Sequence, residues 1–202
     1  DALRADPEVR ALVITGQGTR AFCAGADLKE RRTMSDYQVR AFLDAAGRAF
    51  LALDRLDRPV IAALNGAALG GGLELALACD LRVAAPGVLL GLPEVALGII
   101  PGAGGTQRLP RVVGLARATQ MVLASEKITA EEALRIGLVN RVAPAGQDVL
   151  ACALELARPF AEGAPLALAA ALEALRAADE LTLSEGLARR FPLHPEQVWL
   201  RE

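Results

Sequence analysis

The chain has 202 residues, of which 53% are hydrophobic, 23% charged and only 3% aromatic. This length and composition predict a globular protein of one domain, or two small ones, whose core is filled by Ala, Leu, Val and Gly. A net charge of −2 argues against nucleic acid as the main partner. The apolar runs are interrupted before about 18 residues, so no membrane-spanning helix is expected.

The cysteine and histidine content argues against several kinds of site. Cys23, Cys79 and Cys152 are widely spaced and form no CxxC pair, and His194 is the only histidine. A disulfide framework, a zinc site and a Ser-His-Asp triad are therefore not expected. We expect no metal and no redox cofactor. The first residues resemble neither a signal peptide nor a transit peptide, which makes the cytoplasm the expected location.

The first part of the chain alternates short apolar runs with one long amphipathic segment. Residues 9–15 (VRALVIT) and 59–64 (PVIAAL) are apolar and lead into the turn signals GQG and NG, so each predicts a buried strand. Between them, Ser35 begins a capping-box pattern with Gln38. Apolar residues then recur at helical spacing, which predicts a helix over about 36–53.

The remaining elements follow the same alternation. Thr129 begins a second capping-box pattern with Glu132, and Gly137 is placed to end that helix. Strands are predicted at 81–85 and 137–143, and helices at about 73–80, 147–161 and 165–178. Strands that alternate with helices predict an α/β layered fold.

Two segments rich in small residues could bring backbone N–H groups close to a ligand. They are 65–74 (NGAALGGGLE), which leads into a helix, and 22–30 (FCAGADLKE), which follows the first strand. Consecutive glycines cost backbone entropy, so they need a reason. One interpretation is close packing at a strand-to-helix corner. The other is that N–H groups face a ligand oxygen, and two such turns could form an oxyanion hole.

Two carboxylates lie in otherwise apolar runs. Glu74 is part of LELALA, and Glu94 follows Pro93 among aliphatic residues. Each could be a salt-bridge partner or a helix-end charge. Alternatively, burial would raise the pKa of a carboxyl group into the range useful for acid/base chemistry.

Four segments carry a resemblance to a known family: 22–30, 65–85, 91–111 and 132–142. In this order and spacing they resemble the crotonase superfamily, most closely its enoyl-CoA hydratases, including the methylglutaconyl-CoA hydratase-like subgroup. The resemblance covers roughly residues 5 to 187. It implies an α/β fold, a crotonase-like spiral of ββα turns with a C-terminal helical segment.

The resemblance also implies roles for individual residues. The oxyanion-hole amides correspond to Ala26 and Gly71, and the two catalytic carboxylates to Glu74 and Glu94. Glu94 would supply a proton to the α-carbon, while both carboxylates hold and deprotonate the attacking water. Crotonase isomerases typically keep only the second glutamate, so Glu74 favours hydration. Further contacts to the acyl-CoA substrate are expected from Ala24, Asp27, Leu28, Lys29, Gly70, Pro93 and Gly102.

At the level of the whole chain, the resemblance implies a spiral core over 1–143 and a helical trimerisation segment over 144–202. A homotrimer or dimer of trimers is expected, acting in fatty acid β-oxidation. Family members usually begin with two more strands and a helix that help to hold CoA. After about residue 186 the sequence no longer resembles the family.

Three alternatives to simple enoyl-CoA hydration stay open. The first is another crotonase reaction, either isomerisation or hydration of methylglutaconyl-CoA. The segment ADLKERRTMS resembles the methylglutaconyl-CoA hydratase-like subgroup. The second is RNA binding through Arg31, Arg32, Arg40 and Arg48, although the net acidic charge of the chain argues against it. The third is an inactive paralogue with a scaffolding role.

Overall fold

The structure is a computed structural model that describes residue 3 and residues 6–189. Its strands are β1 (Leu12–Thr15), β2 (Ala21–Cys23), β3 (Val60–Leu64), β4 (Ala67–Leu69), β5 (Leu81–Ala84), β6 (Leu89–Gly91), β7 (Lys127–Thr129) and β8 (Arg141–Val142). Its helices are α2 (Leu28–Arg31), α3 (Asp36–Asp54), α4 (Gly71–Leu77), the 3₁₀ helix η1 (Pro93–Leu97), α5 (Gly105–Val113), α6 (Leu115–Leu123), α7 (Ala130–Arg135), α8 (Val149–Glu162), α9 (Pro165–Ala177) and α10 (Leu183–Ala188).

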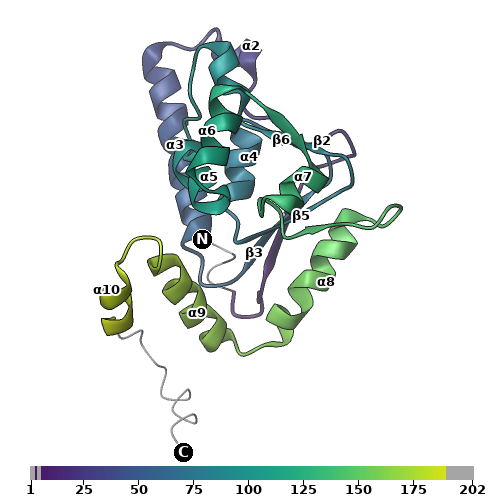
Figure 1. Ribbon diagram of the computed structural model, residues 1–202, viewed down its shortest axis with the longest axis vertical. Coiled ribbons are helices and arrows are strands. Elements are labelled where there is room, and N and C mark those ends of the chain that lie inside the picture. Colours follow the sequence, from purple (N-terminus) through teal and green to yellow (C-terminus); the bar gives the residue numbers. More distant parts are fainter. Residues whose placement is uncertain (1–2, 4–5, 190–202) are drawn as a thin grey trace, which may run out of the picture.

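The described strands form two sheets that the chain visits in turn. One sheet has the order β1-β3-β5-β8 and the other the order β2-β4-β6-β7. The first three turns each add one strand to each sheet and then continue into helices (Figure 1). Neighbouring strands are parallel except β6 and β7, which are antiparallel. The predicted spiral of ββα turns is therefore confirmed.

Strand β3 separates two hydrophobic clusters, because successive side chains of a strand point to opposite faces. Val60, Ala62 and Leu64 belong to the larger cluster around α4. Ile61 and Ala63 belong to the second cluster, which α8 covers from the other face. All five residues are buried, as the continuous apolar run at 59–64 predicts.

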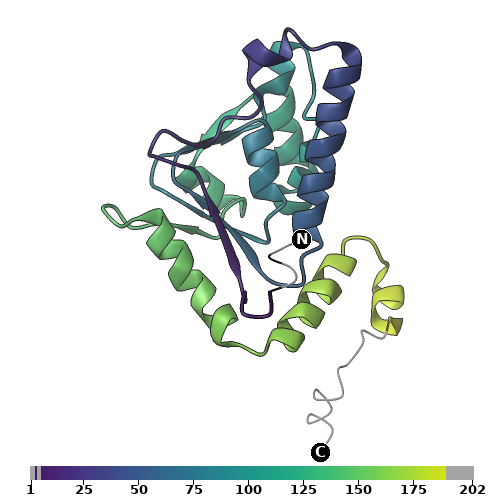
Figure 2. The ribbon, with the colours of Figure 1, turned by 180° about the vertical axis from the view of Figure 1, so that it is seen from behind.

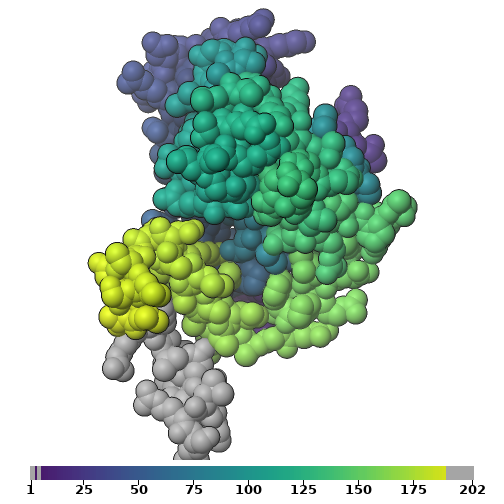
Figure 3. Space-filling view, viewed as in Figure 1, coloured from purple at the N-terminus to yellow at the C-terminus, as the bar shows by residue number. Residues whose placement is uncertain are grey.

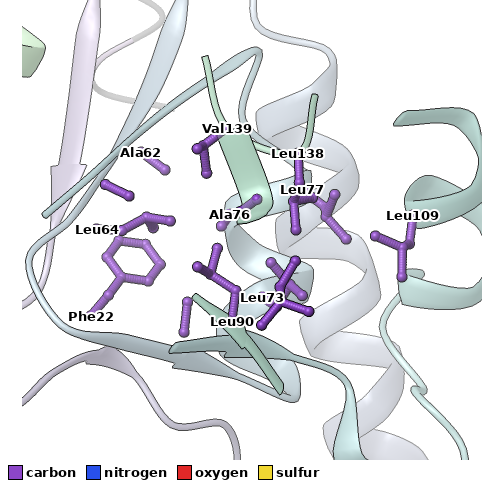
Figure 4. Packing of buried hydrophobic residues seen from close by; sticks show 14 of the residues in the cluster. Phe22, Ala62, Leu64, Leu73, Ala76, Leu77, Leu90, Leu109, Leu138 and Val139 are labelled. Carbon is purple, nitrogen blue, oxygen red and sulfur yellow. The ribbon is translucent and has the colours of Figure 1, made fainter. Parts of the chain in front are cut away.

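Helix α4 packs its apolar face against the strands. Leu73, Ala76 and Leu77 recur at the i, i+3, i+4 spacing of one helix face and are buried. Figure 4 shows Leu73 beside Leu90 of β6, and Leu77 beside Leu138. This packing fixes the helix whose first turn contains Gly71 and Glu74.

Helix α3 begins where the sequence predicts. The Ser35 side chain accepts a hydrogen bond from the Gln38 amide, and the Gln38 side chain accepts one from the Ser35 amide, so the predicted capping box is confirmed. The helix runs alongside α4 and α5 (Figure 2). Its last residue, Asp54, lies next to α5, where it pairs with Arg108.

Two predicted strands were too long. The run at 9–15 is a strand only from Leu12, because pairing with β3 begins at Val60. The run at 137–143 is a strand only over Arg141–Val142. Before it, the amides of Leu138 and Val139 both donate to the carbonyl of Ala133, so those residues continue the end of α7 rather than a ladder.

The second capping box is half correct. The Thr129 hydroxyl accepts a hydrogen bond from the Glu132 amide, as predicted. The Glu132 carboxylate instead binds Arg117 and Arg135, so the reciprocal bond was wrong. A pair of guanidinium groups outcompetes a single backbone N–H for this carboxylate. Gly137 follows α7 with a φ of 78°, as predicted for the residue that ends the helix.

Each successive C-terminal helix buries fewer residues against the rest of the molecule. Helix α8 covers the first sheet, whereas α9 buries only Ala177 and α10 buries no residue. Figure 3 shows α9 and α10, in yellow, protruding at one edge. The domain boundary at residue 143 and the trimerisation role of 144–202 stay predictions, and residues 190–202 lie outside the described part.

Candidate active site

The three glycines at the start of α4 lack a side chain for different reasons. Gly70 has a φ of 56°, a left-handed conformation that side chains disfavour. A Cβ on Gly72 would lie 1.8 Å from the carbonyl oxygen of Cys23, so packing excludes one. A Cβ on Gly71 would meet nothing closer than the Cα of Gly25 at 3.5 Å, an ordinary contact. Packing therefore accounts for Gly72 and leaves Gly71 unexplained.

Two backbone amides beside this turn have no protein partner. Within residues 3 and 6–189, the N–H groups of Gly71 and Ala26 donate to no acceptor. The two turns lie close together at Gly25, because a Cβ on this residue would be 3.2 Å from the Gly71 nitrogen. Amides that are only partly exposed normally find partners, so these two donors are candidates for binding a ligand oxygen.

The Glu74 carboxylate lies at the start of α5 and is held there by backbone donors. Its side chain is 3% exposed, and Oε1 accepts hydrogen bonds from the amides of Ala103 and Gly105, each at 2.8 Å. Both amides donate to the same oxygen, and none of the described groups is recorded as donating to Oε2. The two donors therefore fix which oxygen is available for chemistry.

The turn that supplies these donors depends on glycine. Gly104 has a φ of 109° and precedes the first helical residue, Gly105. A Cβ on Gly105 would lie 2.9 Å from Cδ1 of Leu92 and 3.1 Å from Cγ of Glu74. A bare backbone is needed here for the carboxylate to approach the helix start.

Glu94 is the second buried carboxylate. It follows Pro93 at the beginning of η1 and is 9% exposed. Its Oε2 is buried and has no hydrogen-bond partner within the described residues. Burial raises the pKa of Glu94, and the nearby charge of Glu74 raises it further, although the backbone N–H of Glu94 itself acts in the opposite direction. A carboxyl group in this state can hold a proton for transfer.

The two carboxylates face neighbouring residues of the same glycine turn. Oε1 of Glu94 lies 3.1 Å from the position of a Cβ on Gly70, and Oε2 of Glu74 lies 3.9 Å from that of a Cβ on Gly71. The structure thus brings together five predicted site residues, namely Ala26, Gly70, Gly71, Glu74 and Glu94. None of the described hydrogen bonds ties either carboxylate into an ion pair.

The other predicted substrate contacts lie around this group. Asp27 caps α2 and accepts hydrogen bonds from the amides of Lys29 and Glu30, so its carboxylate shapes the turn after Ala26. Leu28 and Lys29 are exposed on α2, and Ala24 is exposed beside it. Pro93 begins η1, and Gly102 is exposed next to Leu43. Their contacts with CoA stay predictions.

Sequence reasoning missed the residues that support the two glutamates. Ala103 and Gly105 hold Glu74, and the hydroxyl of Ser125 accepts a hydrogen bond from the Ala96 amide of η1 at 3.0 Å. Ser125 has a φ of 51°, the one positive value among the described residues other than glycine. The pair Gly104-Gly105 before a helical run was a detectable signal for a helix start. Nothing in the sequence marks Ser125.

Within residues 3 and 6–189, the structure bears on metal ligands, on the buried thiol of Cys79 and on membrane-spanning helices. No group of three or more His, Cys, Asp or Glu side chains is placed to hold a metal ion there. Burial raises the pKa of the Cys79 thiol to about 12, which makes it a packing residue. None of the described helices is long and apolar enough to cross a membrane.

Comparison with known proteins points in one direction. A family model described as enoyl-CoA hydratase/isomerase matches residues 1–198. The chain is 43% identical over 183 residues to a short-chain-enoyl-CoA hydratase of Clostridium acetobutylicum, covering 91% of this chain and 70% of that protein. It is 44% identical over 191 residues to a mitochondrial methylglutaconyl-CoA hydratase of Rattus norvegicus, covering 93% and 61%.

The fold agrees with the sequence comparison. A crystal structure of an enoyl-CoA hydratase from Bacillus anthracis matches with a TM-score of 0.89 and 44% identity, covering 93% of this chain and 72% of the other. The chain spans about two thirds of the length of the curated relatives it matches. Sequence, fold and the paired turns thus lead to one assignment: the chain belongs to the enoyl-CoA hydratase/isomerase family.

Proposed function

We propose that the protein is an enoyl-CoA hydratase that adds water across the 2,3-double bond of an enoyl-CoA thioester. The observation that carries the proposal is that two buried glutamates, Glu74 and Glu94, face one glycine turn beside two unpaired amides. This arrangement contains an electrostatic site and two acid/base groups, which are the parts that hydration of an activated double bond requires.

The amides of Ala26 and Gly71 would bind the thioester oxygen. Attack on the β-carbon pushes electrons toward that oxygen, so negative charge develops there in the transition state. Donors that already point at this position need no reorganisation, and loss of one such donor costs about 3–4 kcal/mol in comparable sites. The open space at Gly71 on the protein side is consistent with a ligand oxygen approaching it.

The two glutamates would divide the proton transfers. Oε2 of Glu74 takes a proton from water while the water oxygen bonds to the β-carbon, and Glu94 delivers its proton to the α-carbon. The raised pKa of Glu94 favours the protonated form needed for this step. The proton left on Glu74 returns to Glu94 through solvent, which completes the cycle. The reaction so written needs no metal or redox cofactor.

Loss of the enoyl thioester absorbance on hydration tests this function. Glu74→Gln and Glu94→Gln are near-isosteric, and each should lower turnover by about 10²-fold or more. The two losses should not add, because both groups act as a unit in the same addition of water. Glu180→Gln, which changes an exposed glutamate, is the matched control and should keep full activity. A variant of Glu74 or Glu94 that retains a tenth of the activity would contradict its role.

A related substrate is the second candidate. The similarity to a methylglutaconyl-CoA hydratase favours a branched, acidic acyl group as an alternative to a short straight chain. A kinetic survey across acyl-CoA substrates that includes both types would separate them by kcat/KM. An isomerase would instead move the double bond without consuming water, and the presence of Glu74 favours hydration because crotonase isomerases typically keep only the second glutamate.

The proposal extends to the assembly and setting of the protein. Helices α9 and α10 expose Leu175, Leu183 and Leu187, each more than 70% exposed, which suits burial against further copies in a trimer or dimer of trimers. CoA contacts from Ala24, Asp27, Leu28, Lys29, Pro93 and Gly102, and a role in β-oxidation in the cytoplasm, belong to the same proposal.

A further inference from the structure

We infer that Arg108, held by Asp54, is a positioning residue that aims the Glu74 carboxylate by fixing the turn that binds it. The inference rests on the proposed hydratase function and adds residues that touch no reacting atom. It starts from a chain of four contacts between α3 and the candidate active site.

The first contacts join α3 to α5. Nε of Arg108 donates to Oδ2 of Asp54 at 3.1 Å, and a terminal nitrogen of the same guanidinium forms an ion pair with that oxygen. Asp54 is the last residue of α3, and Arg108 lies one turn into α5. The remaining terminal nitrogen of Arg108, Nη1, points back over the start of its own helix.

Nη1 of Arg108 binds the turn that precedes α5. Nη1 of Arg108 donates to the carbonyl of Ala103 at 2.9 Å. It lies so close to Gly104 that a Cβ there would be 2.0 Å away. The guanidinium therefore rests on the bare backbone of Gly104 and holds the peptide between these two residues in one orientation.

Ala103 connects Arg108 to Glu74 through its two backbone groups. Its carbonyl accepts from Arg108, and its own amide donates to Oε1 of Glu74 at 2.8 Å. Ala103 is only 7% exposed, so solvent can replace the guanidinium poorly. Without Arg108 the turn can rotate, Oε1 loses a fixed donor, and Oε2 is no longer aimed at the water that it deprotonates.

We expect this partly exposed ion pair to matter less for folding than for the placement of Glu74, so the two effects can be measured separately. The side chains of Arg108 and Asp54 are 19% and 30% exposed, and pairs of this kind stabilise proteins weakly. A catalytic site is far more sensitive, because displacement of a group by about 1 Å can cost 10²-fold in rate. Activity should therefore respond much more strongly than stability.

The experiment compares Arg108→Met and Asp54→Asn with the matched control Arg117→Met. Arg117 of α6 is 20% exposed and pairs with Glu126, which follows α6, and with Glu132 of α7. Arg108→Met and Asp54→Asn should each lower kcat for hydration about 10-fold or more. KM should stay within about two-fold of the wild-type value, because neither residue touches the thioester. Arg108→Lys, which keeps one donor, should restore part of the loss. The control should leave kcat unchanged.

A second measurement separates positioning from general loosening. Exchange of the α-proton of a saturated acyl-CoA with D₂O needs Glu94 and the two amides, but no water activation by Glu74. Arg108→Met should keep this exchange within about two-fold of the wild type while hydration falls. Equal loss of exchange and hydration would indicate a structural role and overturn the inference.

Two other outcomes are also decisive. Unchanged hydration in Arg108→Met, with an active wild type, would overturn the inference alone. A wild type that hydrates none of the enoyl-CoA substrates in the survey would overturn the proposed function and this inference together.

Discussion

Gly71 and Gly72 are neighbours in the chain, but the structure gives them different environments. A Cβ on Gly72 would collide with the backbone of β2, whereas a Cβ on Gly71 has room. Gly72→Ala should therefore destabilise the protein by about 1–3 kcal/mol, the usual cost of overpacking. Gly71→Ala should leave the unfolding free energy nearly unchanged and lower turnover, because the methyl group stands where the substrate approaches.

Chemical denaturation and steady-state hydration assays on both variants check this pair. Gly71→Pro adds a variant that lacks the N–H altogether, at a first helical position where proline is tolerated. It should lose about 10²-fold in turnover. Full turnover in a folded Gly71→Ala variant would show that this glycine does not face the substrate.

Gly25 allows a test of the second turn. It has a φ of 89°, and a Cβ on it would lie 3.2 Å from the Gly71 nitrogen. Gly18 has a similar φ of 78° with nothing near its Cβ position, so Gly18→Ala carries the same backbone strain alone. Gly25→Ala should lower kcat/KM about 10-fold beyond the Gly18→Ala control, because a methyl group near an oxyanion donor displaces the bound oxygen. Equal effects of the two variants would leave strain as the only cause.

Glu94 should make stability depend on pH. Its pKa is raised in the folded protein, chiefly by burial. Above the unfolded value of about 4.3, the folded state therefore binds more protons than the unfolded state, and stability falls as the pH rises through this window. Glu94→Gln removes the ionisation, so the variant should be more stable than the wild type at neutral pH.

This gain should shrink as the pH falls toward and below about 4.3, because Glu94 becomes protonated in both states of the wild type there. Denaturation curves of the two proteins between about pH 4.5 and 8 measure the difference. A constant difference across that range would show that burial of the Glu94 charge costs no stability.

The sequence could identify the groups of the candidate site but not the scaffold that aims them. Glu74 and Glu94 stood out as carboxylates among aliphatic residues, and both are buried. Ala103 acts through its backbone amide and Ser125 through its hydroxyl. Neither group is marked by a recognisable sequence pattern. Their roles arise only when segments about 30 residues apart meet in space.

At the level of elements, Arg82 ties the end of α4 to the rest of the core. It is 5% exposed, and its guanidinium donates to the carbonyls of Ala76, Cys79 and Leu138 at 2.7 to 3.2 Å. Burial lowers the pKa of Arg82, so those three acceptors offset the cost of keeping the charge inside. Two of them lie at the C-terminal end of α4, where a cation is favourable.

Arg82→Met should therefore destabilise the protein by about 3 kcal/mol or more, since each unsatisfied buried acceptor costs about 1–3 kcal/mol. Arg20→Met, at an exposed position, should change stability by less than about 0.5 kcal/mol. Urea denaturation measures both. Equal stability of the two variants would mean that water or other donors can replace the guanidinium.

The elements divide clearly into those that sequence patterns could and could not predict. Helix α3 and strand β3 are long enough for capping and apolar runs to be recognised. Strands β2, β4, β6 and β7 have three residues each, too few to show a period. The second sheet was therefore accessible only through the family resemblance, because its strands are defined by their neighbours rather than by their own residues.

For the molecule as a whole, the exposed leucines of α9 and α10 predict self-association. The protein should sediment as a trimer or hexamer, and changing Leu175, Leu183 and Leu187 together to Gln should reduce its mass without altering its circular dichroism. Leu115→Gln, at a leucine that is 74% exposed on α6, is the control. A monodisperse, well-folded wild-type monomer would contradict the assembly.

A structure of the protein with a bound acyl-CoA would show whether the two amides and the two glutamates surround the thioester as proposed. We expect the thioester oxygen to lie about 2.7–3.1 Å from the amide nitrogens of both Ala26 and Gly71. We also expect the acyl chain to place its α-carbon next to Glu94 and its β-carbon on the side of Oε2 of Glu74. A thioester oxygen bound elsewhere, or either amide turned away from it, would contradict the proposed mechanism.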